Sequence, residues 1–342
     1  MKRALLTLLL VAGSAHANVW QHAIEKGQPD PAQDVYDSEM KSADDLAMQA
    51  NAKGNSPKNV RHLVDLAVMS YKNAANAKPK EAEPWYRIGR VLYSFYFECD
   101  DGTTSISNAS PICFPHDVML FDRKHALEVV DAWNKFEERA PLDPRLSVHV
   151  TESDILFKRA LLNTKLADKP HLEAASHDYE KILARSDTGM DADDTVWSNL
   201  AETYMMLDRL EDAIDTYHEA IRRGGSSSTI YGLAVALDRD EHTAAAKDLI
   251  VSQGEGSLDD FHKSVMVGHT FFVPRGEEYY YFALAAEAFD RDDDALEYWQ
   301  RYIQSGAHPE FQPRAKAHLA ALAAKGKRRT LPKAPWGDWL EP

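Results

Sequence analysis

The sequence predicts an all-α protein built from consecutive helix-turn-helix units. Apolar residues recur at the i, i+3, i+4 and i+7 spacing of one helix face, most clearly at Trp197, Leu200, Ala201 and Tyr204. Related patterns occur upstream and downstream of this one, as expected for a repeat protein. Of the 342 residues, 44% are hydrophobic and 27% are charged, which is typical of a folded soluble chain. At about 150 residues per domain, this length fits two domains or one elongated array.

Residues 1–17 are predicted to be a secretory signal that does not belong to the fold. The start Met1-Lys2-Arg3 is basic, residues 4–12 form a short apolar run, and Ala15-His16-Ala17 supplies a cleavage site. No stretch approaches the roughly 18 uninterrupted apolar residues that a spanning helix needs. We therefore expect export, to the periplasm or to the extracellular space, without membrane insertion. A buried N-terminal helix or an uncleaved anchor is the alternative.

The segment 18–41 is expected to be irregular, and about six repeats are expected to fill residues 42–308. The first clear half unit is Ala67-x3-Tyr71-x2-Ala74, and the next unit begins with Trp85-x2-Ile88-Gly89-x2-Leu92. Small residues within these patterns let paired helices approach closely. The chain is thus predicted to become regular shortly after residue 41.

An insertion is expected near residues 98–121, and it contains the two cysteines of the chain. Because export exposes the chain to an oxidising compartment, we expect Cys99 and Cys113 to form a disulfide. The helix that completes this repeat is expected to resume near Asp122. Either Ala126 or Ala132 would be its small packing residue.

The later units complete the predicted array. Their patterns are Phe157-x2-Ala160-Leu161 with Ala175-x3-Tyr179-x2-Ile182, then Trp197 to Tyr204 with Ala213-x3-Tyr217-x2-Ala220, a shortened copy from Tyr231 to Val251, and Tyr279-x2-Phe282-Ala283 with Ala295-x3-Trp299-x2-Tyr302. A second insertion is expected at 252–278. Residues 309–326 are predicted to be a solvent-facing capping helix, because Phe311, Ala315, Leu319 and Leu322 recur at helical spacing before Gly326.

The tail 327–342 has no regular pattern and contains Trp336 and Trp339. One interpretation is that these tryptophans dock on the repeats, because large exposed apolar side chains are disfavoured. The other is that the tail is a short segment that binds a partner.

The pattern W-x2-L-A-x2-Y, followed by A-x3-Y-x2-A, resembles the tetratricopeptide repeat, a helix-turn-helix unit of about 34 residues. The resemblance covers roughly residues 42–325. It implies a right-handed superhelical solenoid whose first helices line a concave groove, and it implies docking of peptides or protein elements. The Lys/Asn/Arg carboxylate clamp of chaperone-binding members is not reproduced, so binding of a chaperone C-terminus is not expected.

Groove-facing residues follow from the resemblance by moving one step off the buried stripe of each first helix. The candidates for partner binding are Tyr86, Arg90, Tyr93, Ser198, Glu202, Met205, Tyr280, Leu284 and Glu287. They mix aromatic and polar side chains, as protein-binding surfaces tend to do. The alternative for Tyr86 and Tyr93 is that both pack against the neighbouring repeat.

Charge and motifs exclude several function classes. There are 39 basic and 54 acidic residues, and the resulting net charge of −15 disfavours binding to nucleic acid or to an anionic membrane surface. The chain lacks the glycine-rich, nucleophile-elbow, P-loop and H-E-x-x-H signatures. After the predicted signal, the closest histidines are His171 with His177 and His262 with His269, whose spacings suit a shared metal poorly. We therefore expect no catalytic residues, no cofactor and no metal.

The sequence thus predicts an exported, non-catalytic scaffold or adaptor that binds a protein or peptide through its concave groove. One alternative is an enzyme or enzyme subunit whose site lies in the two insertions. Another is a structural component of the cell envelope that assembles through the ends of the array.

Overall fold

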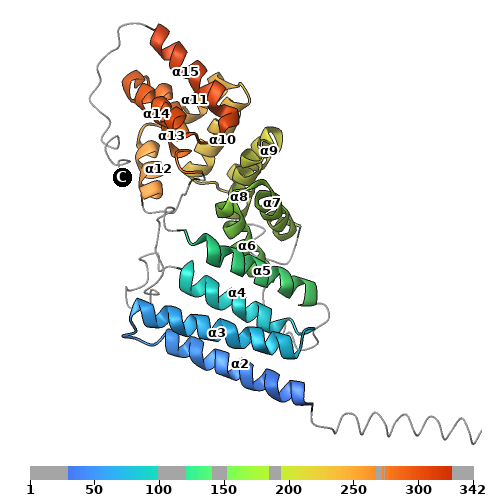
Figure 1. Cartoon of the computed structure of the whole chain (residues 1–342). Coiled ribbons are helices and arrows are strands. Elements are labelled where there is room, and N and C mark those ends of the chain that lie inside the picture. The colour runs from blue at the N-terminus through green and yellow to red at the C-terminus, as the bar shows by residue number, and fades with distance from the viewer. Residues whose placement is uncertain are drawn as a thin grey trace, which may run out of the picture. The chain divides into compact units, whose positions relative to one another are not determined.

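The computed structural model of the chain describes residues 30–98, 121–140, 152–184, 194–266, 272 and 274–325. Every regular element in these ranges is helical, as the sequence predicts (Figure 1). The helices are α2 (Pro31–Ala50), α3 (Pro57–Ala77), α4 (Glu83–Tyr96), α5 (Arg123–Arg139), α6 (Glu152–Leu166), α7 (Lys169–Leu183), α8 (Asp194–Met206), α9 (Leu210–Arg222), α10 (Ser227–Arg239), α11 (Thr243–Ser252), α12 (Gly256–Met266), α13 (Glu278–Ala288), α14 (Asp292–Ser305), η4 (Pro309–Phe311) and α15 (Gln312–Ala324). Among the described helices, none is both long enough and apolar enough to cross a bilayer.

The signal 1–17, both cysteines and the tail 327–342 lie outside the described residues. The cleavage of the signal, the Cys99–Cys113 disulfide and both interpretations of the tail therefore stay predictions.

Helix α2 begins earlier than the sequence predicts. The Asp30 carboxylate accepts a hydrogen bond from the backbone N–H of Ala32 at 3.0 Å and so caps the first turn. Pro31 occupies the first helical position, where an N–H is not needed. The prediction that 18–41 is irregular is therefore wrong from Pro31 onward, while residues 18–29 lie outside the described ranges. The helical face that stabilises this start includes Tyr36 and Met40, which are buried one turn apart.

The chain divides into two compact units. Unit 1 is Met1–Val91 with Lys135–Pro144, and unit 2 is Leu92–Asn134 with Arg145–Pro342, so α4 and α5 contribute to both. In unit 1, α2 packs along α3, and the Tyr71 hydroxyl of α3 donates to the Asp44 carboxylate of α2 at 2.5 Å. Unit 2 contains α6 to α15 and one continuous apolar core.

Antiparallel helix pairs follow one another along the chain, as Figure 1 shows. The pairs α2–α3, α6–α7, α8–α9, α10–α11 and α13–α14 each form an extensive contact. The repeat positions lie at these contacts, and the following side chains are buried: Ala67, Tyr71, Ala74, Ala160, Ala175, Tyr179, Ala201, Tyr204, Ala213, Tyr217, Ala220, Ala283, Ala295, Trp299 and Tyr302. The predicted pairing of helices in these units is confirmed.

Three of the helix pairs turn through the same backbone geometry. Asp208, Glu241 and Asp290 each follow the first helix of a pair in the left-handed conformation, with φ of 60°, 65° and 56°. The N–H of the next residue then bonds to the carbonyl five residues earlier, at 2.8 to 2.9 Å; the bonds run from Arg209 to Tyr204, from His242 to Leu237 and from Arg291 to Ala286. This bond is the signature of a Schellman stop. The sequence repetition is therefore matched by repetition of the backbone.

The helix after the cysteine insertion is α5, which begins at Arg123, close to the predicted Asp122. The Asp122 carboxylate accepts the backbone N–H of His125 at 3.1 Å, so it caps this helix. Ala126 and Ala132 are both buried. Both alternatives for the small packing residue are therefore correct, because Ala126 and Ala132 lie on different turns of one helix and both are buried.

The C-terminal helix α15 docks through a buried charged contact as well as through the predicted apolar face. His318 lies between two carboxylates, with Nε2 at 3.0 Å from Asp238 of α10 and Nδ1 at 2.9 Å from Glu287 of α13. Its ring stacks on Trp299 of α14 at a centroid distance of 4.7 Å. Ala315 and Leu322 are buried on the same face. The predicted helix is confirmed, and one side chain ties it to three others.

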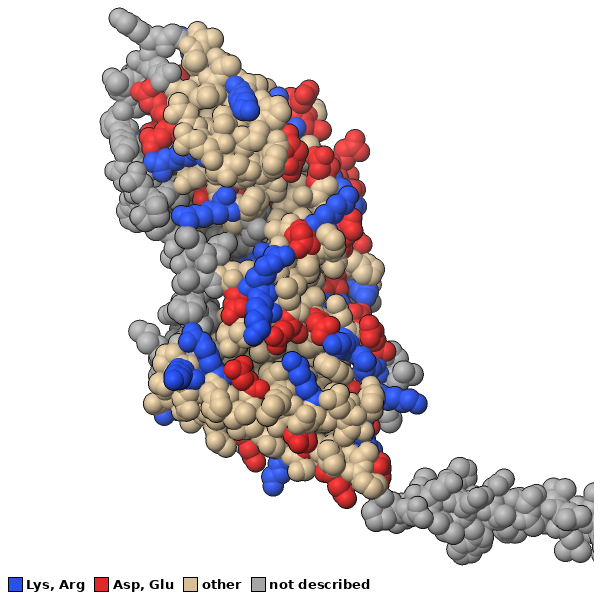
Figure 2. Space-filling model, viewed as in Figure 1, with Lys and Arg blue, Asp and Glu red and all other residues tan. Residues whose placement is uncertain are grey.

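Charged side chains are dispersed over the surface. Figure 2 shows acidic and basic side chains interspersed on the face in view, with no continuous patch of one sign. Several form short pairs along one helix, such as Arg301 with Glu297 at 2.6 Å. The net charge of −15 therefore does not gather into a single field on this face.

Candidate functional site

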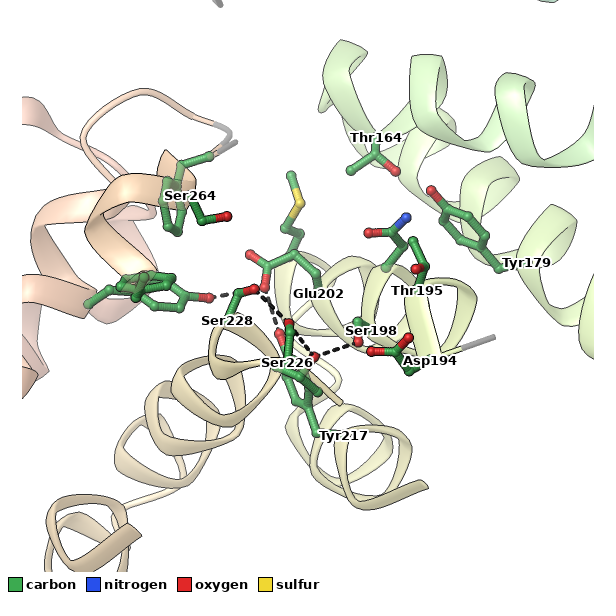
Figure 3. Close-up of a pocket in the computed structure, with 16 residues that line it drawn as sticks. Thr164, Tyr179, Asp194, Thr195, Ser198, Glu202, Tyr217, Ser226, Ser228 and Ser264 are labelled. Atoms are coloured by element: carbon green, nitrogen blue, oxygen red, sulfur yellow. Dashed lines mark hydrogen bonds between the residues drawn. The ribbon is translucent and has the colours of Figure 1, made fainter. Parts of the chain in front are cut away.

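A pocket of about 350 Å³ lies within unit 2, and helix α8 provides much of its lining. Figure 3 shows Glu202 rising from α8 into the space between Ser264 on one side and Thr164 and Tyr179 on the other. The walls come from α6, α7, α9, the start of α10, α12, α13 and Phe272. The pocket therefore brings together residues that are more than 100 positions apart in the chain.

The register of α8 decides which of its side chains reach the pocket. Ser198, Glu202 and Met206 recur every fourth residue and line the pocket. The other side of the helix carries Leu200 and Tyr204, which are buried against neighbouring helices. One helix thus separates a packing face from a ligand-accessible face.

The Glu202 carboxylate is held by two phenols. Its Oε2 atom accepts hydrogen bonds from the Tyr217 hydroxyl of α9 at 2.6 Å and from the Tyr281 hydroxyl of α13 at 3.0 Å. Burial raises the pKa of Glu202, and the two phenol hydrogen bonds offset this rise only in part. The carboxylate is therefore fixed in position but poorly solvated.

Gly232 of α10 makes room for Tyr217. A Cβ atom at position 232 would lie 2.5 Å from the Tyr217 hydroxyl oxygen and 2.6 Å from two of its ring carbons. Only a residue without a side chain permits this approach. The geometry at Glu202 thus depends on a glycine that does not line the pocket.

Hydroxyl groups form a connected chain beside α8. Ser198 and Thr229 are hydrogen-bonded at 2.8 Å, Ser226 and Ser228 at 2.8 Å, and Ser226 and Thr229 at 3.4 Å. Thr164, Thr195 and Ser264 add further hydroxyls to the lining. Because each hydroxyl donates one hydrogen bond and accepts others, this wall can pair with N–H and C=O groups alike.

The opposite wall is aromatic. Phe272 lies 4.8 Å from Tyr281 and Phe261 lies 5.9 Å from it, as centroid distances, and all three line the pocket. Phe261 and Phe272 belong to the segment 252–278, which the sequence identifies as an insertion. This insertion therefore contributes two of the aromatic side chains of the lining.

Only acidic residues carry formal charge in the described lining. Asp194 and Glu202 are present, and no Lys, Arg or His is among the described lining residues. Within the described ranges, no group of three or more His, Cys, Asp or Glu side chains is arranged to hold a metal ion. The pocket is therefore electronegative and rich in hydrogen-bonding groups.

Two of the predicted groove residues line this pocket, and four are misplaced by the prediction. Ser198 and Glu202 line it. Met205 is 0% exposed and packs in the core, whereas its neighbour Met206 reaches the pocket. An α-helix has about 3.6 residues per turn. Met206, four positions after Glu202, therefore lies on the pocket face, whereas Met205, three positions after it, is turned into the core.

On α13 the predicted groove residues Tyr280, Leu284 and Glu287 are all buried in the core, so this part of the prediction is wrong. Tyr280 donates to the Asp238 carboxylate at 2.7 Å, and Glu287 accepts the Trp299 indole N–H at 2.6 Å. The reason is that neighbouring helices cover α13 on this side. Tyr281 faces the pocket instead.

The candidates on α4 are not among the residues that line the pocket. Tyr86 packs on Phe136 of α5 at a centroid distance of 5.7 Å, and Tyr93 packs on Trp133 of α5 at 5.6 Å. Arg90 is exposed and donates to the Tyr86 hydroxyl at 3.3 Å. Both tyrosines therefore pack on the second helix of their own repeat, whereas the alternative placed them against the neighbouring repeat, and binding by Arg90 stays a prediction.

Sequence reasoning missed Tyr217, Phe261 and Tyr281 as lining residues. Tyr217 occupies a repeat position that predicts packing, and it does pack, but its hydroxyl reaches the pocket. Gly232 in the middle of a helix was the available signal for a close approach.

Comparisons with known proteins give distant structural similarity. No family model matches the chain, and no curated protein matches it. Among solved structures, the chain is similar to the MamA protein, with 14% identity and a TM-score of 0.41 over 71% of this chain and 100% of that one. It is also similar to pilF of Pseudomonas aeruginosa, with 10% identity and a TM-score of 0.40 over 86% of this chain and 99% of that one.

The hairpins of this chain, with shared turns and buried repeat positions, are themselves tetratricopeptide-like. The fold is an all-α array of such hairpins.

Proposed function

We propose that this chain is an exported scaffold that holds a protein or peptide partner in the pocket beside α8. The observation that carries the proposal is the pairing of a hydroxyl-rich wall with an aromatic wall. Hydroxyls can bond to both the N–H and the C=O groups of an extended peptide. Aromatic side chains supply apolar contact area, as they do in protein interfaces. A volume of about 350 Å³ is enough for a side chain with its flanking backbone.

The hydrogen bonding of the lining favours holding a ligand over transforming it. A serine or threonine nucleophile needs a base that takes its proton. Here Ser198 and Thr229 are bonded to each other, and the Glu202 carboxylate is bonded to phenols. These groups are therefore arranged as a recognition surface.

Site-specific photo-crosslinking identifies the partner. A photoreactive amino acid at Met206, inside the pocket, should capture one defined protein in the cell envelope. The same group at Val251, which is exposed on α11 and outside the pocket lining, should not capture it. Capture at both positions alike, or at Val251 only, would contradict the proposal.

A blocking variant then tests the site with the captured partner. Thr195 is exposed and lines the pocket, so Thr195→Trp should fill it without disturbing the core. We expect binding to weaken by about tenfold or more, since a filled pocket no longer accepts the anchor residue. Val251→Trp is the matched control and should bind as the wild type does. Unchanged affinity of a folded Thr195→Trp variant would move the site elsewhere.

A further inference from the structure

The Glu202 carboxylate has an unused side. Both phenol hydrogen bonds go to Oε2, and within the described part of the chain no donor bonds to Oε1. An ionised carboxylate offers about four acceptor positions. A carboxylate withdrawn from water is costly unless it gains a charged partner. The pocket therefore contains an acceptor that the described part of the chain leaves incomplete.

The basic residue of the described chain whose charge acts on Glu202 is Arg239, and it already has a partner. Arg239 of α10 forms a buried ion pair with Glu277 at 2.5 Å, and both side chains are 1% exposed. Arg239 acts on Glu202 only through its longer-range field. Since the described lining contains no basic residue, the described part of the chain supplies no direct charged partner for Glu202, and a ligand can supply one.

A second group in the pocket is poorly bonded. The Tyr179 hydroxyl of α7 is fully buried and lines the pocket, and although Thr164 and Asn199 lie near it, it makes no hydrogen bond of good geometry. Figure 3 shows it on the wall next to Thr164, across from Ser264. A buried hydroxyl without a partner is unfavourable by about 1 to 3 kcal/mol. A ligand that reaches Glu202 and bonds to Tyr179 would satisfy both groups.

We infer that this pocket recognises a lysine or arginine side chain of the partner, with Glu202 receiving its ammonium or guanidinium group. This inference rests on the proposed function and names the chemistry that the site selects. Phe261, Phe272 and Tyr281 provide a wall for the aliphatic stem, and aromatic faces attract cations. Tyr179 and the hydroxyls beside it bond to the neighbouring peptide groups. Anionic ligands are disfavoured by Asp194 and Glu202.

The test uses the full-length exported chain and short peptides. The probes are acetylated, amidated pentapeptides of alanine with a central lysine or with norleucine, which matches the lysine stem but has no charge. Binding is measured by NMR titration or calorimetry. The lysine peptide should bind about tenfold or more tightly than the norleucine peptide, and Glu202→Gln should remove this preference, because the amide keeps the shape and loses the charge.

The matched control is Glu211→Gln, since Glu211 is an exposed acid on α9 outside the pocket lining. It should keep the preference for lysine. Equal binding of the two peptides to the wild type overturns the inference, and so does a preference for lysine that survives in Glu202→Gln. An unchanged melting temperature shows that the Glu202→Gln variant is folded.

Two further outcomes are decisive. Failure of both peptides to bind at millimolar concentration overturns the inference, whereas the proposed function still stands if Thr195→Trp blocks the crosslinked partner. The tail of the chain contains Lys327, Arg328 and Arg329. A chain that ends at Lys325 lacks these basic residues. If the lysine peptide binds to this shortened chain and not to the full chain, the tail itself is the ligand of the pocket, and the assignment to a partner is wrong.

Discussion

Single positions with little or no side chain determine how closely the helices of unit 2 approach. Gly232 lets the Tyr217 ring lie against the backbone of α10, and Ala213 is fully buried at the contact of α8 with α9. Protein interiors are packed as densely as organic crystals, so one added methyl group at such a position displaces its neighbours.

Gly232→Ala should destabilise the protein by about 1 to 3 kcal/mol, because the new methyl group overlaps the Tyr217 ring. The displaced ring would also lose its hydrogen bond to Glu202. Urea unfolding measures the change in free energy of unfolding. Gly256→Ala is the control, since a Cβ atom there meets nothing within 4 Å, and the two variants should differ clearly.

Ala213→Leu should cost about 1 to 3 kcal/mol through overpacking, whereas Glu211→Ala should change the free energy of unfolding by less than about 0.5 kcal/mol. Position 213 is 0% exposed, and Glu211 is exposed on the same helix. Thermal or urea unfolding compares the two. Equal effects would mean that the helix presents a different face to its neighbours.

At the scale of elements, the turns and the docking of α15 set the local stability. The shared Schellman stops place Asp208, Glu241 and Asp290 at positive φ, where a side chain is unfavourable by about 1 kcal/mol or more. The C-terminal helix depends instead on charge, through His318.

Glu241→Gly should stabilise the protein by about 0.5 kcal/mol. Glycine relieves the left-handed strain, while the greater freedom of the unfolded chain offsets part of the gain. Asp248→Gly, at an exposed position within α11, should instead destabilise by about 0.3 kcal/mol, since glycine has a slightly lower helix propensity than aspartate. Chemical denaturation separates the two signs. A loss of stability in Glu241→Gly equal to that in Asp248→Gly would argue against a strained turn.

The docking of α15 should weaken at alkaline pH. Burial alone would lower the pKa of His318, but hydrogen bonds to Asp238 and Glu287 outweigh burial and raise the pKa to about 9. The charged imidazolium is therefore favoured in the folded state. The charged imidazolium contributes at most roughly 3 kcal/mol to the free energy of unfolding. This contribution is complete below pH 6.5, the pKa in the unfolded chain, and it is lost as pH rises through about 9.

Urea unfolding at pH 7 and pH 10 checks this dependence. Because other groups also titrate in this interval, the wild type is compared with His318→Gln, which cannot carry the charge. The variant should be less stable at pH 7 and should lose less stability between the two pH values. Parallel losses in both proteins would show that His318 is not the responsible group.

At the scale of the whole molecule, export and the disulfide are predicted from segments outside the described residues. Cleavage after Ala17 should leave a mature chain that begins at Asn18, because small residues at positions 15 and 17 suit signal peptidase. N-terminal sequencing of the protein recovered from the cell envelope or the medium measures this. A recovered protein that begins at Met1 would contradict it.

The sequence by itself determined the class of fold and most of the helix pairs. Alanine and aromatic residues at helical spacing, such as Ala213 and Tyr217, encode a local period and a local packing face. Both are properties of neighbouring residues in the chain. The same local register brought Ser198 and Glu202 to the accessible face of α8, and the structure agrees.

Only the tertiary structure decided which faces stay open. The residues of α13 are buried from Tyr280 to Glu287, so its own pattern does not distinguish a core face from a groove face. Tyr280 is buried against Asp238, and Glu287 is buried against His318. Tyr281 instead bonds to Glu202, which lies 79 positions earlier in the sequence. A helical period specifies how one helix is oriented, whereas a pocket depends on which distant helices pack around it.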